Sequence, residues 1–396
     1  MASMTSDTSA PPSSSGGVPT HTTAKRHDSS AAAGRAPRGP CLRRPPRGHS
    51  ARTGARRLGH TSTSDYAHSH LALLVPNRGR AYDTGILARL THRRPESEGP
   101  LSLLTIVVCT RDRPEMLGEL LDALAAESAE SVAEIVVVDQ GRRRPARVSA
   151  AASRPPITVI RDDQQGVSRA RNLGVRRART NWVAFLDDDC LPGPGWAARL
   201  ASVCARHPAA GFVSGMLESG DRSPADLTVV GVQHVSWPRV RSGRWRTPPL
   251  AIGQGASFAV QRRVVERLGG WDERLGTGTR PFPAGEDLDF NYRFLRAGGV
   301  AYLTPELRVT HRQWRTETDL TRLHAGYLAG NAGCAIKHLR TDDLAGGAWL
   351  WLRLAWGVAF MFAGAIRTRS PLHRRLAVAQ ARGLALGTAE AFRHVW

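Results

Sequence analysis

Between residues 101 and 315, short apolar segments alternate with amphipathic stretches. Segments of strand length, mostly apolar, occur at 103–109, 135–138, 157–160 and 182–186. They lack a strict polar alternation, so we expect strands covered on both faces, as in a parallel sheet. Leucines at helical spacing follow the first segment, and a second amphipathic stretch spans 167–179. Strands that alternate with helices predict an α/β fold with a mostly parallel sheet.

Polar residues directly follow three of these segments. Thr110 follows the first, Asp139 the second, and the triplet Asp187, Asp188 and Asp189 the fourth. Ligands of open α/β sheets bind at the carboxyl ends of strands. Clustered carboxylates raise one another's pKa unless a cation lies among them, and oxygen ligands favour Mg²⁺ or Mn²⁺. The alternative is an acidic turn that caps the next helix.

A second acidic cluster, at 285–289, opens another amphipathic stretch. A carboxylate here is a candidate general base. The alternative is a pair of acidic residues that the helix dipole favours at a helix start. Two glycines at 253 and 255 would let the backbone pass close to a ligand, although a plain turn into a strand is also compatible with them. The aspartate triplet favours the catalytic interpretation of this second cluster.

Several protein classes are disfavoured by missing motifs. No G-x-G-x-x-G follows the first strand, and no G-x-x-x-x-G-K-[ST] occurs, which argues against a dinucleotide-binding Rossmann domain and a P-loop NTPase. The five cysteines show no C-x-x-C spacing, so neither a zinc site nor a disulfide framework is expected. We expect a reducing cytoplasm as the compartment.

Charge and composition set the N-terminal region apart. Residues 1–97 are rich in Ser, Thr, Ala, Pro, Gly and Arg, and we expect a disordered arm because such a segment buries too little apolar surface. The net charge of +21 is carried mainly by arginines along the whole chain. Nucleic-acid binding is one interpretation, but no nucleic-acid motif accompanies the charge. An anionic membrane or an anionic sugar nucleotide fits equally well.

Taken together, residues 101–314 resemble the inverting family 2 glycosyltransferases, which share the GT-A fold. The matching segments, in order, are 107–114, 135–139, 166–174, 185–189, 270–273, 285–289 and His311. We therefore divide the chain into a disordered arm at 1–97, a GT-A domain at 101–315 and a helical region at 316–396. The resemblance implies a nucleotide-diphospho-sugar donor and a glycan or lipid-linked acceptor, with no nucleic-acid partner.

The resemblance also implies roles on the donor side. Thr110, Arg111 and Asp139 would form the pocket for the base and ribose, and Arg169 would lie near the base or the diphosphate. Gln140 stands where family members often carry a second acidic residue. Gly255 belongs to a glycine-containing loop beside the donor sugar and the acceptor.

The aspartate triplet resembles the D-x-D motif of the family. Asp189 would be the direct metal ligand, with Asp187 as a second ligand or, like Asp188, nearer the ribose. His311 resembles a C-terminal histidine that completes the metal site. A neutral imidazole among carboxylates favours Mn²⁺ over Mg²⁺.

Glu286 and Asp287 resemble the xED motif, in which Asp287 would be the catalytic base. Because neighbouring positions of a helix face different directions, we expect Glu286 to bind acceptor hydroxyls instead. A sugar-nucleotide nucleotidyltransferase is the alternative enzyme. It would be expected to carry a glycine-rich, lysine-containing loop after the first strand, and the segment 111–114 is not one.

The C-terminal region reads as helical. Residues 344–366 form a tryptophan-rich apolar segment that contains Arg353, and basic residues follow it at 367, 369, 374 and 375. This pairing predicts a helix lying in the interface of an anionic membrane, flanked by a second amphipathic helix at 376–392. A dimer contact or a helix buried against the catalytic domain is the alternative. We expect a cytoplasmic protein at the inner face of the plasma membrane.

Overall fold

The computed structural model describes residues 103–125, 127, 130–142, 155–220, 231–312 and 314–396. The predicted arm at 1–97 lies outside the described residues. The predicted domain boundaries therefore stay predictions on the N-terminal side.

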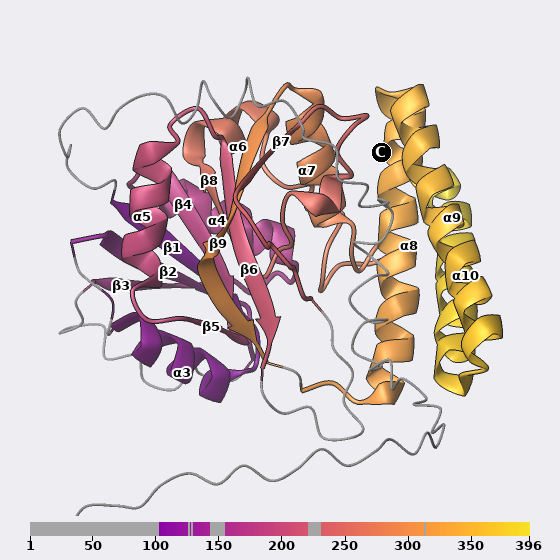
Figure 1. The fold of residues 1–396 in the computed structure, drawn as a ribbon, viewed down its shortest axis with the longest axis horizontal. Helices are drawn as coiled ribbons and strands as arrows, with labels where there is room; N and C mark the ends of the chain where they lie inside the picture. The colour runs from indigo at the N-terminus through magenta and orange to yellow at the C-terminus, as the bar shows by residue number, and fades with distance from the viewer. Residues whose placement is uncertain (1–102, 126, 128–129, 143–154, 221–230, 313) are drawn as a thin grey trace, which may run out of the picture. The chain divides into compact units, whose positions relative to one another are not determined.

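A nine-stranded sheet forms the centre of the described domain, in the order β3-β2-β1-β4-β8-β6-β9-β5, with β7 paired to β9 (Figure 1). Six strands run in one direction: β1 (Leu104–Thr110), β2 (Val132–Asp139), β3 (Ile157–Arg161), β4 (Trp182–Asp187), β6 (Phe212–Ser219) and β9 (Val300–His311). Three run against them: β5 (Cys190–Pro192), β7 (Arg239–Ser242) and β8 (Ser257–Gln261). The predicted α/β fold with a mostly parallel sheet is confirmed.

Helices cover both faces of this sheet. On one face α3 (Pro114–Ala125) and α5 (Trp196–Arg206) pack against Ile106 and Val108, which are fully buried. On the other face α4 (Val167–Arg177), α6 (Arg262–Leu268) and α7 (Glu286–Arg296) pack against Val107 and Val136. Successive side chains of β1 thus enter opposite cores, which is why its sequence is apolar throughout.

Three elements were not predicted. β5 has three residues, one of them Pro192, and α6 has seven, so neither carries a readable period. β7 has a polar sequence, Arg-Val-Arg-Ser, and becomes a strand through its pairing with β9. A short 3-10 helix, η1 (Pro249–Ala251), leads on to β8.

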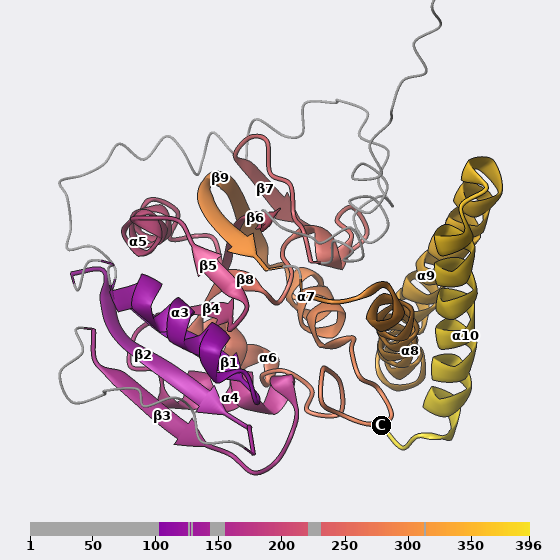
Figure 2. The ribbon, with the colours of Figure 1, turned by 90° about the horizontal axis from the view of Figure 1, so that it is seen from below.

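The C-terminal region consists of three long helices: α8 (Glu317–Thr341), α9 (Leu344–Thr368) and α10 (Pro371–Arg393). α8 lies beside α7, and α9 and α10 pack on α8 from outside (Figure 2). Leu275, Phe282 and Tyr292 of the sheet domain share a buried cluster with Leu350 and Ala391, which joins the two regions. α9 is long and apolar enough to cross a membrane, and 22% of its most apolar window is buried.

Candidate active site

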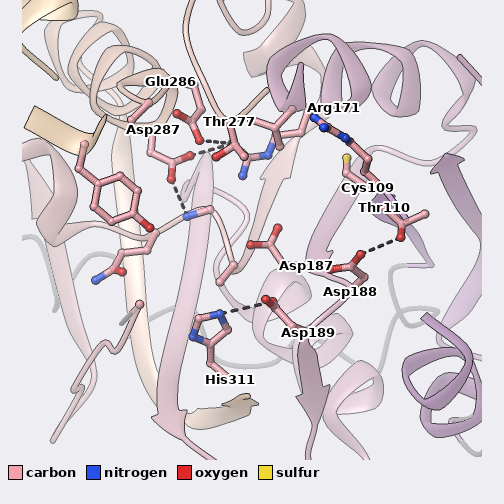
Figure 3. A pocket seen from close by; sticks show the side chains of 18 of the residues that line it. Cys109, Thr110, Arg171, Asp187, Asp188, Asp189, Thr277, Glu286, Asp287 and His311 are labelled. Atoms are coloured by element: carbon pink, nitrogen blue, oxygen red, sulfur yellow. Dashed lines mark hydrogen bonds and ion pairs between the residues drawn. The ribbon is translucent and has the colours of Figure 1, made fainter. Parts of the chain in front are cut away.

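A cleft of about 610 Å³ lies at the carboxyl ends of β1 and β4 and reaches the start of α7 (Figure 3). Most of the predicted site residues line it: Thr110, Arg111, Asp187, Asp188, Asp189, Gly255, Glu286, Asp287 and His311. The sheet topology accounts for this, because β1 and β4 are adjacent parallel strands and end at the same edge. The triplet forms one wall of the cleft, and the two carboxylates of α7 lie across it.

The triplet turns the chain from β4 into β5. Thr110, at the end of β1, donates a hydrogen bond of 2.7 Å to Asp188 Oδ2. Nη1 of Arg113, in the first turn after β1, lies 2.9 Å from both Asp188 Oδ1 and Asp189 Oδ2. Its contact with Asp188 Oδ1 is outside hydrogen-bonding geometry, so this buried oxygen has no hydrogen-bond donor among the described residues.

Asp189 lies next to His311 because β5 pairs with β9. The backbone N–H of Arg312 donates to the carbonyl of Asp189, and this pairing places His311 Nε2 3.3 Å from Asp189 Oδ1. Trp314 donates to Asp189 Oδ2 from its indole Nε1 at 3.0 Å. Asp189, Cys190 and His311 are all buried, and their potential ligand atoms lie within 4.8 Å of one another.

The pKa values of the triplet show that nearby cations do not balance the negative charge of Asp187 and Asp188. Burial, together with the charge of Asp189, raises the pKa of Asp187 to about 6. Burial raises the pKa of Asp188 to about 7, against the opposing effects of Arg113 and Thr110. Burial also acts on Asp189, but the hydrogen bond from His311 and the charges of His311 and Arg113 outweigh it and hold its pKa well below the usual range. Two of the three carboxyl groups thus hold protons more tightly than free aspartate.

This donor set fits a divalent ion. Asp187, Asp189 and His311 supply carboxylate oxygens and an imidazole nitrogen at the cleft wall, and an added cation would favour the ionised form of Asp187 and Asp188. The same ion would also stabilise Asp188 Oδ1, the buried oxygen that has no hydrogen-bond donor among the described residues. Cys190 fits a ligand role less well, because its thiol does not line the cleft and because Mg²⁺ and Mn²⁺ prefer oxygen ligands to thiolates.

Across the cleft, one arginine holds both carboxylates of the α7 start. Asp287 Oδ1 accepts a hydrogen bond of 2.8 Å from Arg171 Nη1, and its Oδ2 accepts one of 2.8 Å from the backbone N–H of Gly255. Glu286 Oε1 lies 3.8 Å from the same Arg171 Nη1. Our expectation that the two carboxylates face apart is therefore wrong, because Arg171 lies close enough to the helix start to meet both.

The two carboxylates differ in burial and charge. Burial, and next the charge of Asp287, raises the pKa of Glu286 to about 8. The side chain of Asp287 is 24% exposed at the cleft, whereas that of Arg171 is 3% exposed. Burial would lower the pKa of Arg171, but Asp287 and Glu286 raise it above the ordinary value, so its charge is permanent. Asp287 is thus the carboxylate that an incoming group can reach.

Arg171, Arg113 and Trp314 are site residues that sequence reasoning missed. Arg171 lies in the 166–174 segment that supported the resemblance, on the buried face of α4 with Ala170 and Asn172. Arg171 lies three residues after Ser168 and four before Val175, both buried, and a buried arginine needs a carboxylate partner. This spacing is the signal that could have found it. Arg113 follows β1 directly and is part of the matching segment 107–114.

Two predicted donor residues do not line the cleft. Asp139 is buried, accepts from the backbone N–H of Gly141 at 2.8 Å and forms an ion pair with Arg161. Arg169 Nε lies 3.0 Å from Asp162 Oδ2. The residue at the cleft wall is instead Gln140, whose side chain accepts from the backbone N–H of Gly166 at 3.0 Å. The departure from the family pattern at Gln140 therefore lies within the site itself.

A second buried group of metal-ligand type lies between α7 and α8. Asp289, Cys334 and His338 place their ligand atoms within 4.8 Å of one another. Asp289 is already surrounded by donors: Lys337 Nζ at 2.7 Å, His338 Nε2 at 2.9 Å and Arg293 Nη2 at 2.7 Å. Its negative charge is neutralised by cationic side chains, so this group has no place for a metal ion.

The comparisons with known proteins agree with the geometry of the site. Residues 105–269 match the family model "Glycosyl transferase family 2". Residues 105–269 belong to glycosyl transferase family 2. The family and the class of enzyme predicted from the sequence are thereby confirmed.

Curated relatives of this glycosyltransferase domain cover part of the chain. An uncharacterized glycosyltransferase of Haemophilus influenzae is 30% identical over 201 residues, which are 49% of this chain and 62% of the relative. The succinoglycan biosynthesis protein ExoM of Rhizobium meliloti is 31% identical over 211 residues, 51% of this chain and 64% of the relative. A pre-mycofactocin glycosyltransferase of Mycobacterium tuberculosis is 25% identical over 282 residues, 68% of this chain and 56% of the relative. The chain thus spans less than two thirds of each of these relatives.

Among solved structures, a mannosyltransferase of Pyrobaculum calidifontis in complex with GDP-Man and Mn²⁺ is similar at a TM-score of 0.46 and 17% identity. The similarity covers 78% of this chain and 93% of that one.

Proposed function

We propose that this chain is an inverting glycosyltransferase that moves a sugar from a nucleotide-diphospho-sugar to an acceptor hydroxyl. One observation supports this most strongly: a single cleft places an aspartate triplet with a histidine on one wall and an oriented, accessible carboxylate on the other. The first wall suits the diphosphate of a donor, and the second suits proton removal from an acceptor. Membership of residues 105–269 in the family supports the same assignment.

On the donor wall, Asp189, Asp187 and His311 would hold Mg²⁺ or Mn²⁺. When bound, such an ion neutralises the negative charge of a departing diphosphate. Arg111 and Thr110 lie at the end of β1 beside this wall, where a nucleotide would contact them. Arg113 holds Asp188 and Asp189 in place through its two short contacts.

On the acceptor wall, Asp287 would act as general base. An acceptor hydroxyl oxygen attacks the anomeric carbon of the donor sugar, and its proton passes to the Asp287 carboxylate. The bond from the anomeric carbon to the diphosphate oxygen breaks, and the bonding electrons leave with the nucleoside diphosphate. Arg171 and the Gly255 N–H occupy one lone pair on each Asp287 oxygen, so they fix its orientation while leaving it able to accept a proton.

For the acceptor, we propose a glycan or a lipid-linked sugar, and for the location the inner face of the plasma membrane. The motivating observation is the outer face of α9, where Leu352 is 62% exposed, Trp356 68% and Phe360 46%. These residues recur every fourth position and form one apolar stripe. A bilayer interface would cover such a stripe, and tryptophan is a preferred residue there.

The test of the proposed reaction is Asp287→Asn. The substitution keeps the shape and one of the two hydrogen bonds, from Arg171 or from the Gly255 N–H, but removes the proton acceptor, so turnover should fall by about 10²–10⁴-fold. Binding of the donor's nucleoside diphosphate with Mn²⁺, measured by calorimetry, should remain near that of the unmodified protein. Asp122→Asn on the exposed side of α3 is the matched control and should keep full turnover. More than a tenth of the original turnover in Asp287→Asn would rule out Asp287 as the base.

A further inference from the structure

A second cavity lies outside the catalytic cleft, in a groove between α8 and α10 of about 910 Å³. Its lining is strongly cationic: Arg322, Arg374, Arg375, Arg382 and Arg393, against the single carboxylate Glu390. Arg393 lies 3.8 Å from Glu390, and Arg322 lies 3.7 Å from Asp319, but arginines still outnumber carboxylates in the lining by five to one.

The floor of this groove is apolar and closed. A Cβ on Gly383 would lie 2.2 Å from the Ala325 carbonyl oxygen, so α10 and α8 touch backbone to backbone along this line. Val378 is 54% exposed and Leu386 57%, and both line the groove. With Arg382 between them at four-residue spacing, cationic and apolar side chains alternate along one face of α10.

The groove also lies close to the catalytic cleft. Pro281 and Pro283 are among its lining residues, and Ala284, which follows Pro283, lines the cleft. Pro283 reaches α8 at Gly326, where an added Cβ would lie 3.4 Å from the proline Cγ. A molecule in the groove is thus separated from the cleft by this one loop and by α8.

We propose that the groove between α8 and α10 binds an anionic membrane lipid, with its phosphate on the arginines and its hydrocarbon chain along Val378 and Leu386. Arginine pairs with phosphate through several parallel N–H groups, and exposed apolar side chains are stabilised when a hydrocarbon chain removes them from water. A nucleic acid would pair with the arginines but would not cover the apolar side chains of Val378 and Leu386. A neutral peptide would cover these apolar side chains but would leave the arginines without a negative partner.

Charge also excludes the occupants that the chain itself could supply. Residues 1–97 contain 15 Lys and Arg against 5 Asp and Glu, so this segment is repelled by the arginine lining. A second copy carries a net charge of +21 and is disfavoured for the same reason. The proposal concerns lipid binding alone and does not depend on the transfer reaction.

The first experiment compares co-sedimentation of the full chain with phosphatidylglycerol and with phosphatidylcholine vesicles. The test variant combines Arg374→Gln, Arg375→Gln and Arg382→Gln. The matched control, Arg176→Gln with Arg263→Gln and Arg267→Gln, removes three charges from exposed positions of α4 and α6. Each basic residue near an anionic surface strengthens binding about fivefold, so the test variant should bind phosphatidylglycerol about 100-fold more weakly. The control variant should bind far better, and equal loss in both variants would overturn the proposal.

A second pair of variants separates the groove from the apolar stripe of α9. Leu386→Glu places a negative charge on the groove floor, whereas Leu352→Glu places one on the outer face of α9, and both positions are exposed. We expect Leu386→Glu to weaken binding to phosphatidylglycerol. Loss confined to Leu352→Glu would overturn the groove as the lipid site. So would an affinity for soluble glycerol 3-phosphate equal to that for phosphatidylglycerol vesicles, since the chain contact would then contribute nothing.

Discussion

The two buried groups of Asp, Cys and His differ in one respect that decides their roles. Around Asp289, two cations, Arg293 and Lys337, and the imidazole of His338 surround one carboxylate, and the group is closed between α7 and α8. Around Asp189, three carboxylates share Arg113 and His311, and the group opens into the cleft. Both have the spacing of metal ligands. Spacing alone therefore does not identify a metal site, whereas uncompensated charge with access from a cleft does.

The pKa shifts show the same contrast. Burial would raise the pKa of Asp289, but Arg293, His338 and Lys337 outweigh it and hold the pKa far below the usual range. In the triplet, burial raises the pKa of Asp187 and Asp188, and the cations nearby do not outweigh it. The charge of Asp289 is balanced within the protein, whereas an added cation would favour the ionised forms of Asp187 and Asp188.

The largest effect that separates the two groups is on stability. Asp289→Ala leaves Lys337, Arg293 and His338 with uncompensated charge or unmet hydrogen bonds in a buried place, so we expect a loss of about 3–5 kcal/mol of unfolding free energy. Asp188→Ala removes a carboxylate that already repels its neighbours, so we expect a much smaller change. Urea unfolding of both variants without metal measures this difference. Equal destabilisation would contradict the contrast between the two groups.

The next effect is on pH dependence, and its sign differs between the groups. The pKa of Asp188 rises from 3.8 to about 7 on folding, so between these pH values the native state binds this proton more tightly than the unfolded state. The contribution of Asp188 to the unfolding free energy therefore falls as pH rises from 3.8 to about 7. Asp289, and Asp272 with a pKa of about 2, are lowered instead, so their contribution is present above pH 3.8 and is lost as pH falls below it.

Melting temperatures measured from pH 4 to pH 8 with Mn²⁺ and with a chelator test these signs. Mn²⁺ should stabilise the protein more at pH 8 than at pH 5, because its ligands must first lose their protons. We expect Mn²⁺ to raise the melting temperature of Asp289→Asn by as much as it raises that of the unmodified protein. A gain from Mn²⁺ that does not change with pH would show that the triplet is not the group that binds it.

The smallest effect concerns the cysteine within the cleft group. Cys190→Ala should change Mn²⁺ affinity by no more than about twofold, because the thiol does not line the cleft and Mn²⁺ prefers oxygen ligands. A metal titration with a competing indicator measures this affinity. A tenfold loss would make Cys190 a ligand and would require a different coordination set.

Much of the site could be predicted from the sequence because its residues follow strands. Thr110 and the triplet stand at the ends of β1 and β4, where adjacency of parallel strands alone brings them together. Arg171 could not be placed this way, since its contact with Asp287 joins α4 to α7 across the cleft. Asp139 shows that a position at a strand end does not suffice. It ends β2 as predicted, but its side chain pairs with Arg161 of β3 and does not line the cleft.

The fold shows the same division between local and long-range information. Buried strands such as β1 are readable from apolar composition alone. β7 has a polar sequence and exists through its pairing with β9, and α9 has an apolar sequence that leaves its outer face exposed. For β7, the partner that decides the structure is distant in the chain.

Metal-dependent binding of a nucleoside diphosphate tests the central claim most directly. A calorimetric screen of nucleoside diphosphates with Mn²⁺ first identifies the one that binds. That diphosphate is then titrated into the unmodified protein, into Asp189→Ala and into the unmodified protein with a chelator. We expect binding in the first titration and its loss in the other two, because Asp189 is the carboxylate held ionised next to His311. Binding that survives the chelator, or equal affinity in Asp189→Ala, would contradict it.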